Sequence, residues 1–216
     1  MNKSGWIGAA LFVLLASNSW AADETGLVTA LSGTVKLKDE KAAVTALKAF
    51  TKLRQGDQIM LEGVSRIQVV YFDGGLQETW LGAGEIGIGN TSSKKIKGSP
   101  QLETKTLPAI LVKQLTKTPS TDNNGNVKVG MTRTRSIASK EKTEAAEKEY
   151  AQLRSQTETS DRSPELYLLA SYLELREYDK LESFLKELNE KSPNHAELAS
   201  LTDLYTRAIN ELKSGK

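Results

Sequence analysis

Residues 65–81 read SRIQVVYFDGGLQETWL, which places two β-prone runs on either side of an Asp-Gly-Gly turn signal. Asp-Gly between such runs is a strong hairpin signal, because the central turn positions favour positive φ. Shorter runs precede it: residues 27–31 and 34–38 flank Ser32-Gly33, and residues 59–61 end at Glu62-Gly63. We interpret both dipeptides as turns between short strands. Strands separated by turns about every 8–12 residues predict a small β sandwich or barrel.

Two neighbouring segments carry competing signals. Residues 42–53 place apolar side chains at helical spacing, but they lie within β-rich sequence, so we predict strands and a loop. Residues 82–87 match the pattern G-x-G-x-x-G, yet Ile88-Gly89-Asn90 follows in place of the helix that would hold a pyrophosphate. We therefore expect a bent or bulged strand there and no bound dinucleotide.

The first 21 residues have the composition of a secretory signal peptide. Lys3 is followed by an apolar run over residues 7–16 and by the small-x-small pattern Ser19-Trp20-Ala21. The run is shorter than the roughly 20 residues that span a bilayer. We expect cleavage after residue 21 and a soluble mature protein in the periplasm, without a transmembrane segment.

Residue content limits the chemistry. The sequence holds one histidine, His195, and no cysteine, which excludes disulfides, Cys-His nucleophiles and most zinc ligand sets. A periplasmic protein meets no useful nucleotide pool, so we expect no cofactor. Nucleic-acid binding is also not expected, because no aromatic residue lies between Trp80 and Tyr150 to stack on bases.

Carboxylates are the remaining catalytic candidates. Asp57, Asp73, Glu78 and Glu85 could supply the pair that glycoside hydrolysis needs. Carboxylates are common at turns and on exposed strand faces, however, and about sixty residues of β structure build a shallow cleft. We expect no catalytic residue and no metal site, and keep a cell-wall hydrolase as the third interpretation of function.

Four short motifs in the β-rich region resemble the FecR-type domain of bacterial envelope proteins. They are Gly33-Thr34-Val35, LRQGDQI at residues 53–59, GVSRIQV at residues 63–69 and FDGG at residues 72–75. The resemblance implies a FecR-like β domain over residues 22–92, in which the motif residues have structural roles: Gly33, Gly56, Asp57, Gly63, Asp73 and Gly74. Glycines there permit tight turns, and Asp57 can cap local backbone N–H groups.

The resemblance also implies a setting in the cell envelope. Well-known members of the family join this domain to a transmembrane helix and a cytoplasmic anti-sigma segment, neither of which is recognisable here. Other members are exported and are suspected of binding cell-wall glycans or partner proteins. Trp80 is our candidate sugar contact, with a core position as the alternative, because a tryptophan buries a large area.

A basic segment follows over residues 93–136. Its prolines and the run Thr121 to Asn126 are typical of a linker, while residues 107–115 could dock as a strand or short helix and residues 127–131 could form one more strand. The positive charge has two interpretations: a solvated connector, or a peripheral contact with an anionic envelope surface.

Residues 137–216 predict an antiparallel helical module. One helix is expected over residues 139–156, and a second begins with Ser163 as N-cap and Pro164 at the first helical position. Turns are expected at residues 177–179 and 192–194. Asn194 with Glu197 resembles a capping box for a last helix that ends near Leu212.

The same region resembles a degenerate tetratricopeptide repeat. Leu168, Tyr172, Leu185 and Pro193 occupy the motif's large apolar, aromatic, apolar and closing proline positions, whereas Leu169 and Leu181 replace its small residues. One repeat cannot bury its own face, so flanking helices or the β domain must cover it. The module could offer a shallow groove to a partner or only add core.

These observations predict an α+β protein in which a β domain precedes a helical module. The function that fits best is a non-enzymatic periplasmic binding or adaptor protein that recognises a cell-wall glycan or an envelope protein. The alternative is a soluble component that relays a signal in an envelope signalling pathway.

Overall fold

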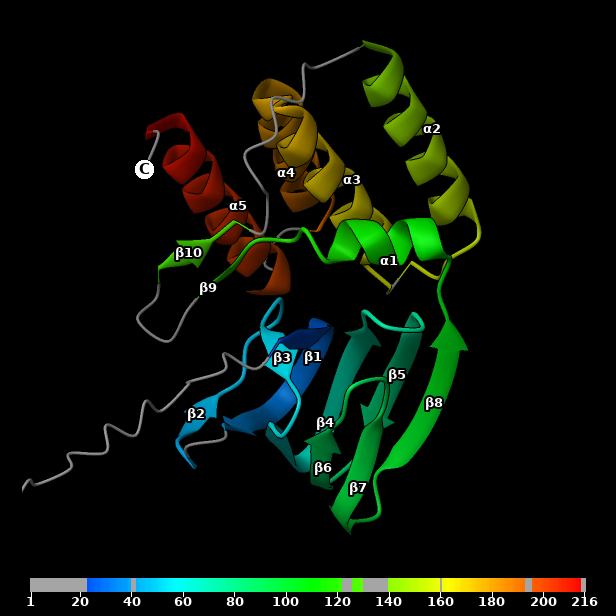
Figure 1. Cartoon of the computed structure of the whole chain (residues 1–216), viewed down its shortest axis with the longest axis vertical. Coiled ribbons are helices and arrows are strands. Elements are labelled where there is room, and N and C mark those ends of the chain that lie inside the picture. The colour runs from blue at the N-terminus through cyan, green and yellow to red at the C-terminus, as the bar shows by residue number, and fades with distance from the viewer. Residues whose placement is uncertain are drawn as a thin grey trace, which may run out of the picture.

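The computed structural model describes residues 23–39, 42–121, 126–129, 140–159, 161–192 and 196–214. The expected signal peptide, His195 and Asn194 lie outside these residues. The fold is α+β, as predicted: an antiparallel sheet forms the N-terminal part and helices dominate the C-terminal part (Figure 1). Among the described residues, no helix has both the length and the hydrophobicity of a membrane span.

The strands are β1 (Glu24–Lys38), β2 (Val44–Ala46), β3 (Lys52–Arg54), β4 (Gln58–Tyr71), β5 (Leu76–Leu81), β6 (Gly84–Ile88), β7 (Ser93–Gly98), β8 (Gln101–Thr106), β9 (Ser120–Thr121) and β10 (Val127–Lys128). The helices are α1 (Ala109–Leu115), α2 (Lys140–Ser155), α3 (Ser163–Leu175), α4 (Tyr178–Lys191) and α5 (Ala196–Ser214).

The eight-stranded sheet folds back on itself along its two longest strands, β1 and β4. The first half of β1 and the second half of β4 pair with each other and with β3, β5 and, through β5, β8. We call these strands the upper layer. The other halves of β1 and β4 pair with β2, β6 and, through β6, β7, and form the lower layer.

The corner between the layers corrects one prediction. Ser32-Gly33 and Glu62-Gly63 are not turns, because β1 and β4 run through both positions. The register passes from Ser32 opposite Arg66 to Thr34 opposite Glu62, so Gly33 alone faces residues 63–65. Gly33 has φ +81°, a conformation that glycine supplies to some β-bulges as well as to turns. The glycine at Ser32-Gly33 therefore does mark a change of chain direction, but the change is a bend within β1 and not a turn between two strands.

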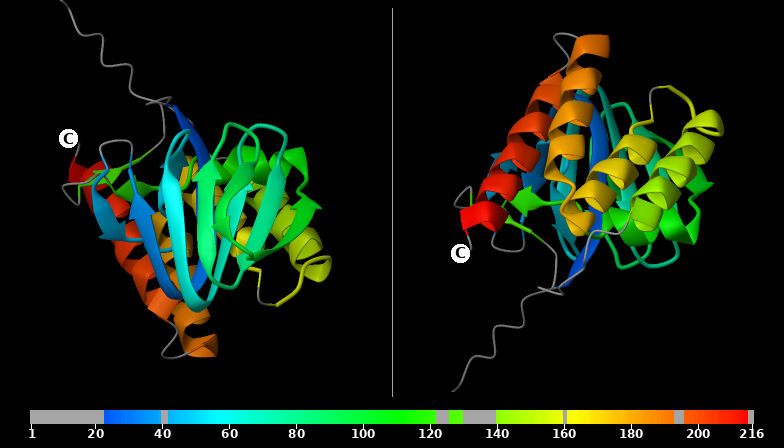
Figure 2. Two further views of the ribbon diagram at one scale, coloured as in Figure 1. Left: turned by 90° about the horizontal axis from the view of Figure 1, so that it is seen from below. Right: turned by 90° about the horizontal axis from the view of Figure 1, so that it is seen from above.

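The upper layer has two different faces because side chains alternate along a strand. Val28 and Val69 point into the apolar core between the two layers. Leu27 and Val70, one residue away on each strand, belong to a second core that includes the helices. Figures 1 and 2 show the helices together on this side of the β part.

Other predictions for the β region are confirmed. Asp73 and Gly74 lie in the turn between β4 and β5, residues 42–53 form β2, β3 and a loop, and the register shifts at Glu85/Ile86 inside β6. The segment expected as a linker departs from expectation in its first third. Residues 93–106 form β7 and β8, which pair with β6 and β5. Of the strand or short helix expected over residues 107–115, the structure has the helix, α1, and β10 begins at Val127.

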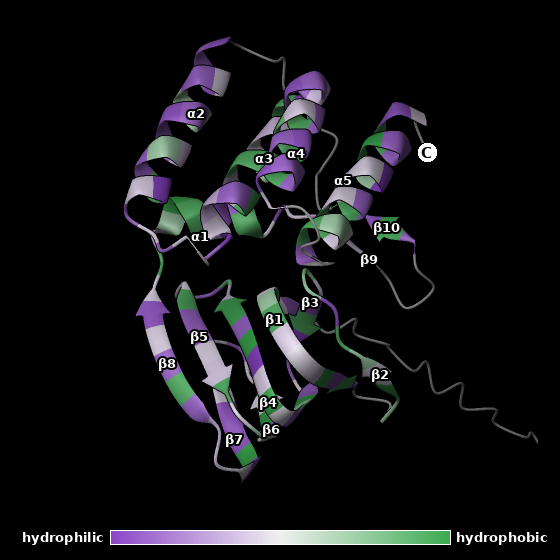
Figure 3. Cartoon of the chain, turned by 180° about the vertical axis from the view of Figure 1, so that it is seen from behind, coloured by the Kyte–Doolittle hydropathy of each residue, from purple (hydrophilic) through white to green (hydrophobic). Residues whose placement is uncertain are grey.

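The helical module surrounds α3, which is buried along nearly its whole length. Helix α2 packs against α3 and α4. The rings of Tyr150 on α2 and Phe184 on α4 lie edge to face, with 5.4 Å between their centroids. The predicted cap is off by one residue: Arg162 is the N-cap and Ser163 is the first residue of α3, whose backbone N donates to Asp161 Oδ1 at 2.9 Å. The alternating colours of α2 and α5 in Figure 3 show their amphipathic character.

Candidate functional site

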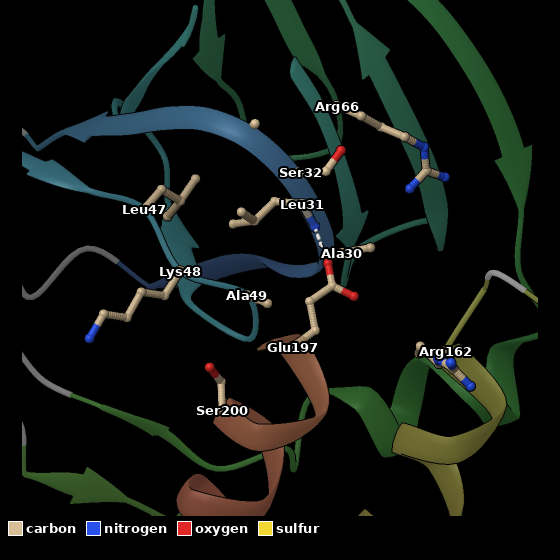
Figure 4. Close-up of a pocket in the computed structure, with 11 residues that line it drawn as sticks. Ala30, Leu31, Ser32, Leu47, Lys48, Ala49, Arg66, Arg162, Glu197 and Ser200 are labelled. Atoms are coloured by element: carbon tan, nitrogen blue, oxygen red, sulfur yellow. Dashed lines mark hydrogen bonds between the residues drawn. The ribbon is translucent and has the colours of Figure 1, made fainter. Parts of the chain in front are cut away.

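A cavity of about 590 Å³ lies where the sheet meets the helical module, and we call it the arginine cleft. Its walls come from the β1 bend, the β2–β3 loop, strand β4 and the starts of α3 and α5 (Figure 4). The volume falls in the range of about 300–1,000 Å³ typical of small-ligand sites. Segments far apart in the sequence therefore build one concave surface.

One long-range hydrogen bond holds the cleft together. Leu31 N, on β1, donates to Glu197 Oε1, on the first turn of α5, at 2.9 Å across 166 positions of sequence (Figure 4). A hydrogen bond to a charged group contributes about 1.5–3 kcal/mol. This contact fixes the start of α5 against the sheet at the mouth of the cleft.

The cleft is predominantly cationic. Arg66 and Arg162 lie on one side of it and Lys48 on the other (Figure 4), and Glu197 is the one acidic residue among its described lining residues. Both arginines are half-buried, and neither guanidinium forms a hydrogen bond or ion pair with a described residue. Arginines usually pair when water is partly removed, so two free guanidinium groups favour an anionic ligand.

The loop that carries Arg162 is anchored from behind. Arg154 Nη1 donates to Asp161 O at 2.8 Å and to both oxygens of Glu165 at 3.0 Å. Asp161 Oδ1 in turn accepts a hydrogen bond from Ser163 N at the start of α3. These bonds hold the backbone on both sides of Arg162.

Of the predicted motif residues, Gly33 lines the arginine cleft and the others do not. Gly56 and Gly63 have positive φ, as does Gly74 in the β4–β5 turn. The expected role of Asp57 is confirmed, because its Oδ2 accepts a hydrogen bond from Arg54 N at 2.8 Å and closes the turn before β4. These six residues therefore shape the framework, and Gly33 is the one among them that lines the cleft.

Trp80 does not serve as a surface platform for a sugar. Its side chain is 4% exposed within the core between the layers, and its Nε1 donates to Glu78 Oε2 at 2.9 Å. Glu78 also accepts from Ser93 N at 3.0 Å, and Tyr71 and Ser93 share a hydroxyl contact of 2.6 Å. Burial raises the pKa of Tyr71, so this network stays protonated at the phenol. The Trp80 ring is therefore part of the hydrophobic core, which was the alternative prediction for this residue.

The carboxylates considered for catalysis are spread over separate elements. Asp57 closes one turn, Asp73 lies in another, Glu78 is buried on β5, and Glu85 lies on β6. Within the parts of the chain that the structure describes, no group of three His, Asp or Glu side chains is arranged to hold a metal ion.

Sequence reasoning missed the residues that define the cleft. Arg66 lies within the GVSRIQV motif but was given no role there, Arg162 lies in the break before α3, and Glu197 was noted only for its place near a helix start. Only the folded sheet and helices bring them together.

No family model, curated protein or solved structure matches this chain.

Proposed function

We propose that this chain is an exported, non-catalytic recognition protein of the cell envelope, and that the arginine cleft receives an anionic group of an envelope polymer or partner protein. The observation that carries the proposal is the pair Arg66 and Arg162, which reach one cleft from the sheet and from the helices without a carboxylate partner among the described residues. Planar guanidinium groups suit carboxylate and phosphate oxygens.

The proposed setting depends on the N-terminal sequence pattern. A leader of this composition directs export, and anionic groups are abundant on the polymers and lipids that an exported protein meets. Two charged contacts in a half-buried cleft contribute enough for selective binding, because each such hydrogen bond contributes about 1.5–3 kcal/mol.

The test is cosedimentation of the mature chain with purified peptidoglycan. Arg66→Gln with Arg162→Gln removes two positive charges from the cleft, and Lys94→Gln with Lys95→Gln removes two from the exposed strand β7. We expect at least about tenfold weaker retention for the arginine variant and little change for the lysine variant. Thermal unfolding of both variants verifies that they fold.

Opposite results point elsewhere. If the lysine variant loses retention and the arginine variant keeps it, the basic strand binds the polymer and the cleft does not. If the wild-type chain stays in the supernatant but captures an envelope protein through Arg66, the signalling relay becomes the better interpretation.

A further inference from the structure

A second cavity, of about 360 Å³, lies beside the arginine cleft between the upper layer and the α2–α3 loop. We call it the polar groove. Every described residue that lines it has a polar or charged side chain, including Gln68 and Thr79 on the sheet and Thr104 on β8. Ligand cavities are usually lined largely by apolar side chains, so this composition is informative about the occupant.

The floor of the groove is ordered by its own hydrogen bonds. Thr29 Oγ1 donates to Gln68 Oε1 at 2.8 Å, and Gln68 Nε2 reaches Thr79 Oγ1 at 3.5 Å. Gln77 Nε2 donates to Asp161 Oδ2 at 3.3 Å, which joins the sheet to the helical module. These buried side chains hold amide and hydroxyl groups at fixed positions along the groove.

The two cavities are neighbours. Arg66 lines both of them, and on the opposite wall the consecutive residues Asp161 and Arg162 line the polar groove and the arginine cleft respectively. An elongated ligand whose acidic group lies at the arginines can therefore reach the polar groove with its next unit.

Resting on the proposed function, we propose that the ligand is an extended oligosaccharide in which a carboxylate-bearing sugar is followed by a neutral one. The carboxylate lies at Arg66 and Arg162. Hydroxyl groups of the next sugar lie over Gln and Thr side chains, which both donate and accept hydrogen bonds as hydroxyls do.

Charge and polarity in the groove favour this occupant over others. Three acidic residues, Glu103, Glu158 and Asp161, line the groove. They outnumber its two lining cations, Arg66 and Lys105, and Lys105 Nζ lies 3.8 Å from Asp161 Oδ2. A second carboxylate on the adjoining sugar would meet these acids. A peptide would bring apolar side chains to walls that offer them no apolar contact in the described residues.

The experiment is a calorimetric length series with defined probes on the mature chain. The probes are oligosaccharides that alternate glucuronate with N-acetylglucosamine, neutral N-acetylglucosamine oligomers of equal length, and oligoglutamate peptides. We expect the alternating tetrasaccharide to bind at least about tenfold more tightly than glucuronate alone. Neutral oligomers and peptides should bind more weakly than the alternating tetrasaccharide.

Two variants separate the contributions of the two cavities. Thr104→Ala with Gln156→Ala changes two exposed groove residues whose side chains form no hydrogen bond with a described residue. This variant should reduce the affinity ratio of the tetrasaccharide over glucuronate about fivefold or more and leave glucuronate binding unchanged. Arg66→Gln should weaken the binding of both glucuronate and the tetrasaccharide.

Each other outcome is decisive. If binding depends on the arginines but the tetrasaccharide binds no more tightly than glucuronate, the oligosaccharide inference is overturned and the proposed function stays intact. Tighter binding of oligoglutamate overturns it in favour of an acidic peptide. If substitution of Arg66 and Arg162 changes the affinity of none of the probes, both the inference and the proposed function are overturned.

Discussion

The two faces of the upper layer share a backbone but differ in what covers them. The inner face is apolar and is sealed by the lower layer, with Val69 and Trp80 in the core between them. The helix-facing side is apolar at Leu27 and Val70 and polar at Gln68 and Thr79. The helices seal the apolar end and leave cavities at the polar end. One face therefore stabilises the fold, and the other leaves a site.

The largest effect is expected on the sealed face. Trp80→Ala should lower the free energy of unfolding by about 3–5 kcal/mol, because a buried aromatic side chain is lost and Glu78 loses a donor. Urea unfolding measures the change. Val64→Ala, at a side chain that is 99% exposed, is the control and should change it by less than about 0.5 kcal/mol. Similar values for the two variants would contradict the assignment of Trp80 to the core.

A smaller loss is expected where charges hold the helix-facing side. Glu165→Gln should lower the free energy of unfolding by about 2–3 kcal/mol, because the half-buried Arg154 loses a carboxylate that is 4% exposed. Glu187→Gln in the exposed pair with Lys191 should cost less than about 0.5 kcal/mol. Chemical denaturation of the two variants decides this. Equal losses would mean that the Arg154 network does not anchor the loop.

The bend between the layers offers a matched pair of glycines. Gly33→Ala should lower stability by about 2 kcal/mol, because its φ is +81° and a new Cβ would lie 2.6 Å from Ser65 Oγ and 2.9 Å from Ser65 Cα. Gly63→Ala at the same corner has φ +59° and no atom within 4 Å of the new Cβ, so it should lose only about 1 kcal/mol. A larger loss at Gly63 would show that the two strands do not pack at this bend as described.

The smallest effect is a pH dependence on the outer helices, remote from either face. The hydrogen bond from Lys180 lowers the pKa of Glu147. A lowered folded-state pKa contributes stability above the ordinary glutamate pKa of about 4.3, and this is lost as pH falls through the lower folded value. Glu147→Gln should therefore cost about 0.5 kcal/mol at pH 7 and less as acid is added below pH 4. Unfolding curves at a series of pH values measure this, and a cost that grows in acid would reverse the assigned sign.

The sequence predicts what is local and misses what is assembled. Asp73-Gly74 and the start of α3 near Pro164 are set by a few neighbouring residues, and both were found, the latter with its cap misplaced. Gly33 signals positive φ but cannot say whether the chain turns or bends, because that depends on the partner strand. Nothing near Arg66 in the sequence indicates that the start of α3 will lie beside it.

The most direct test is an amide NMR titration of the ¹⁵N-labelled mature chain with the tetrasaccharide that alternates glucuronate and N-acetylglucosamine. The account predicts shift changes that begin at Leu31, Arg66 and Arg162 and extend to Thr79 and Thr104, the residues of the arginine cleft and polar groove. Shift changes confined to the lysines of β7, or none at saturating tetrasaccharide, would contradict it.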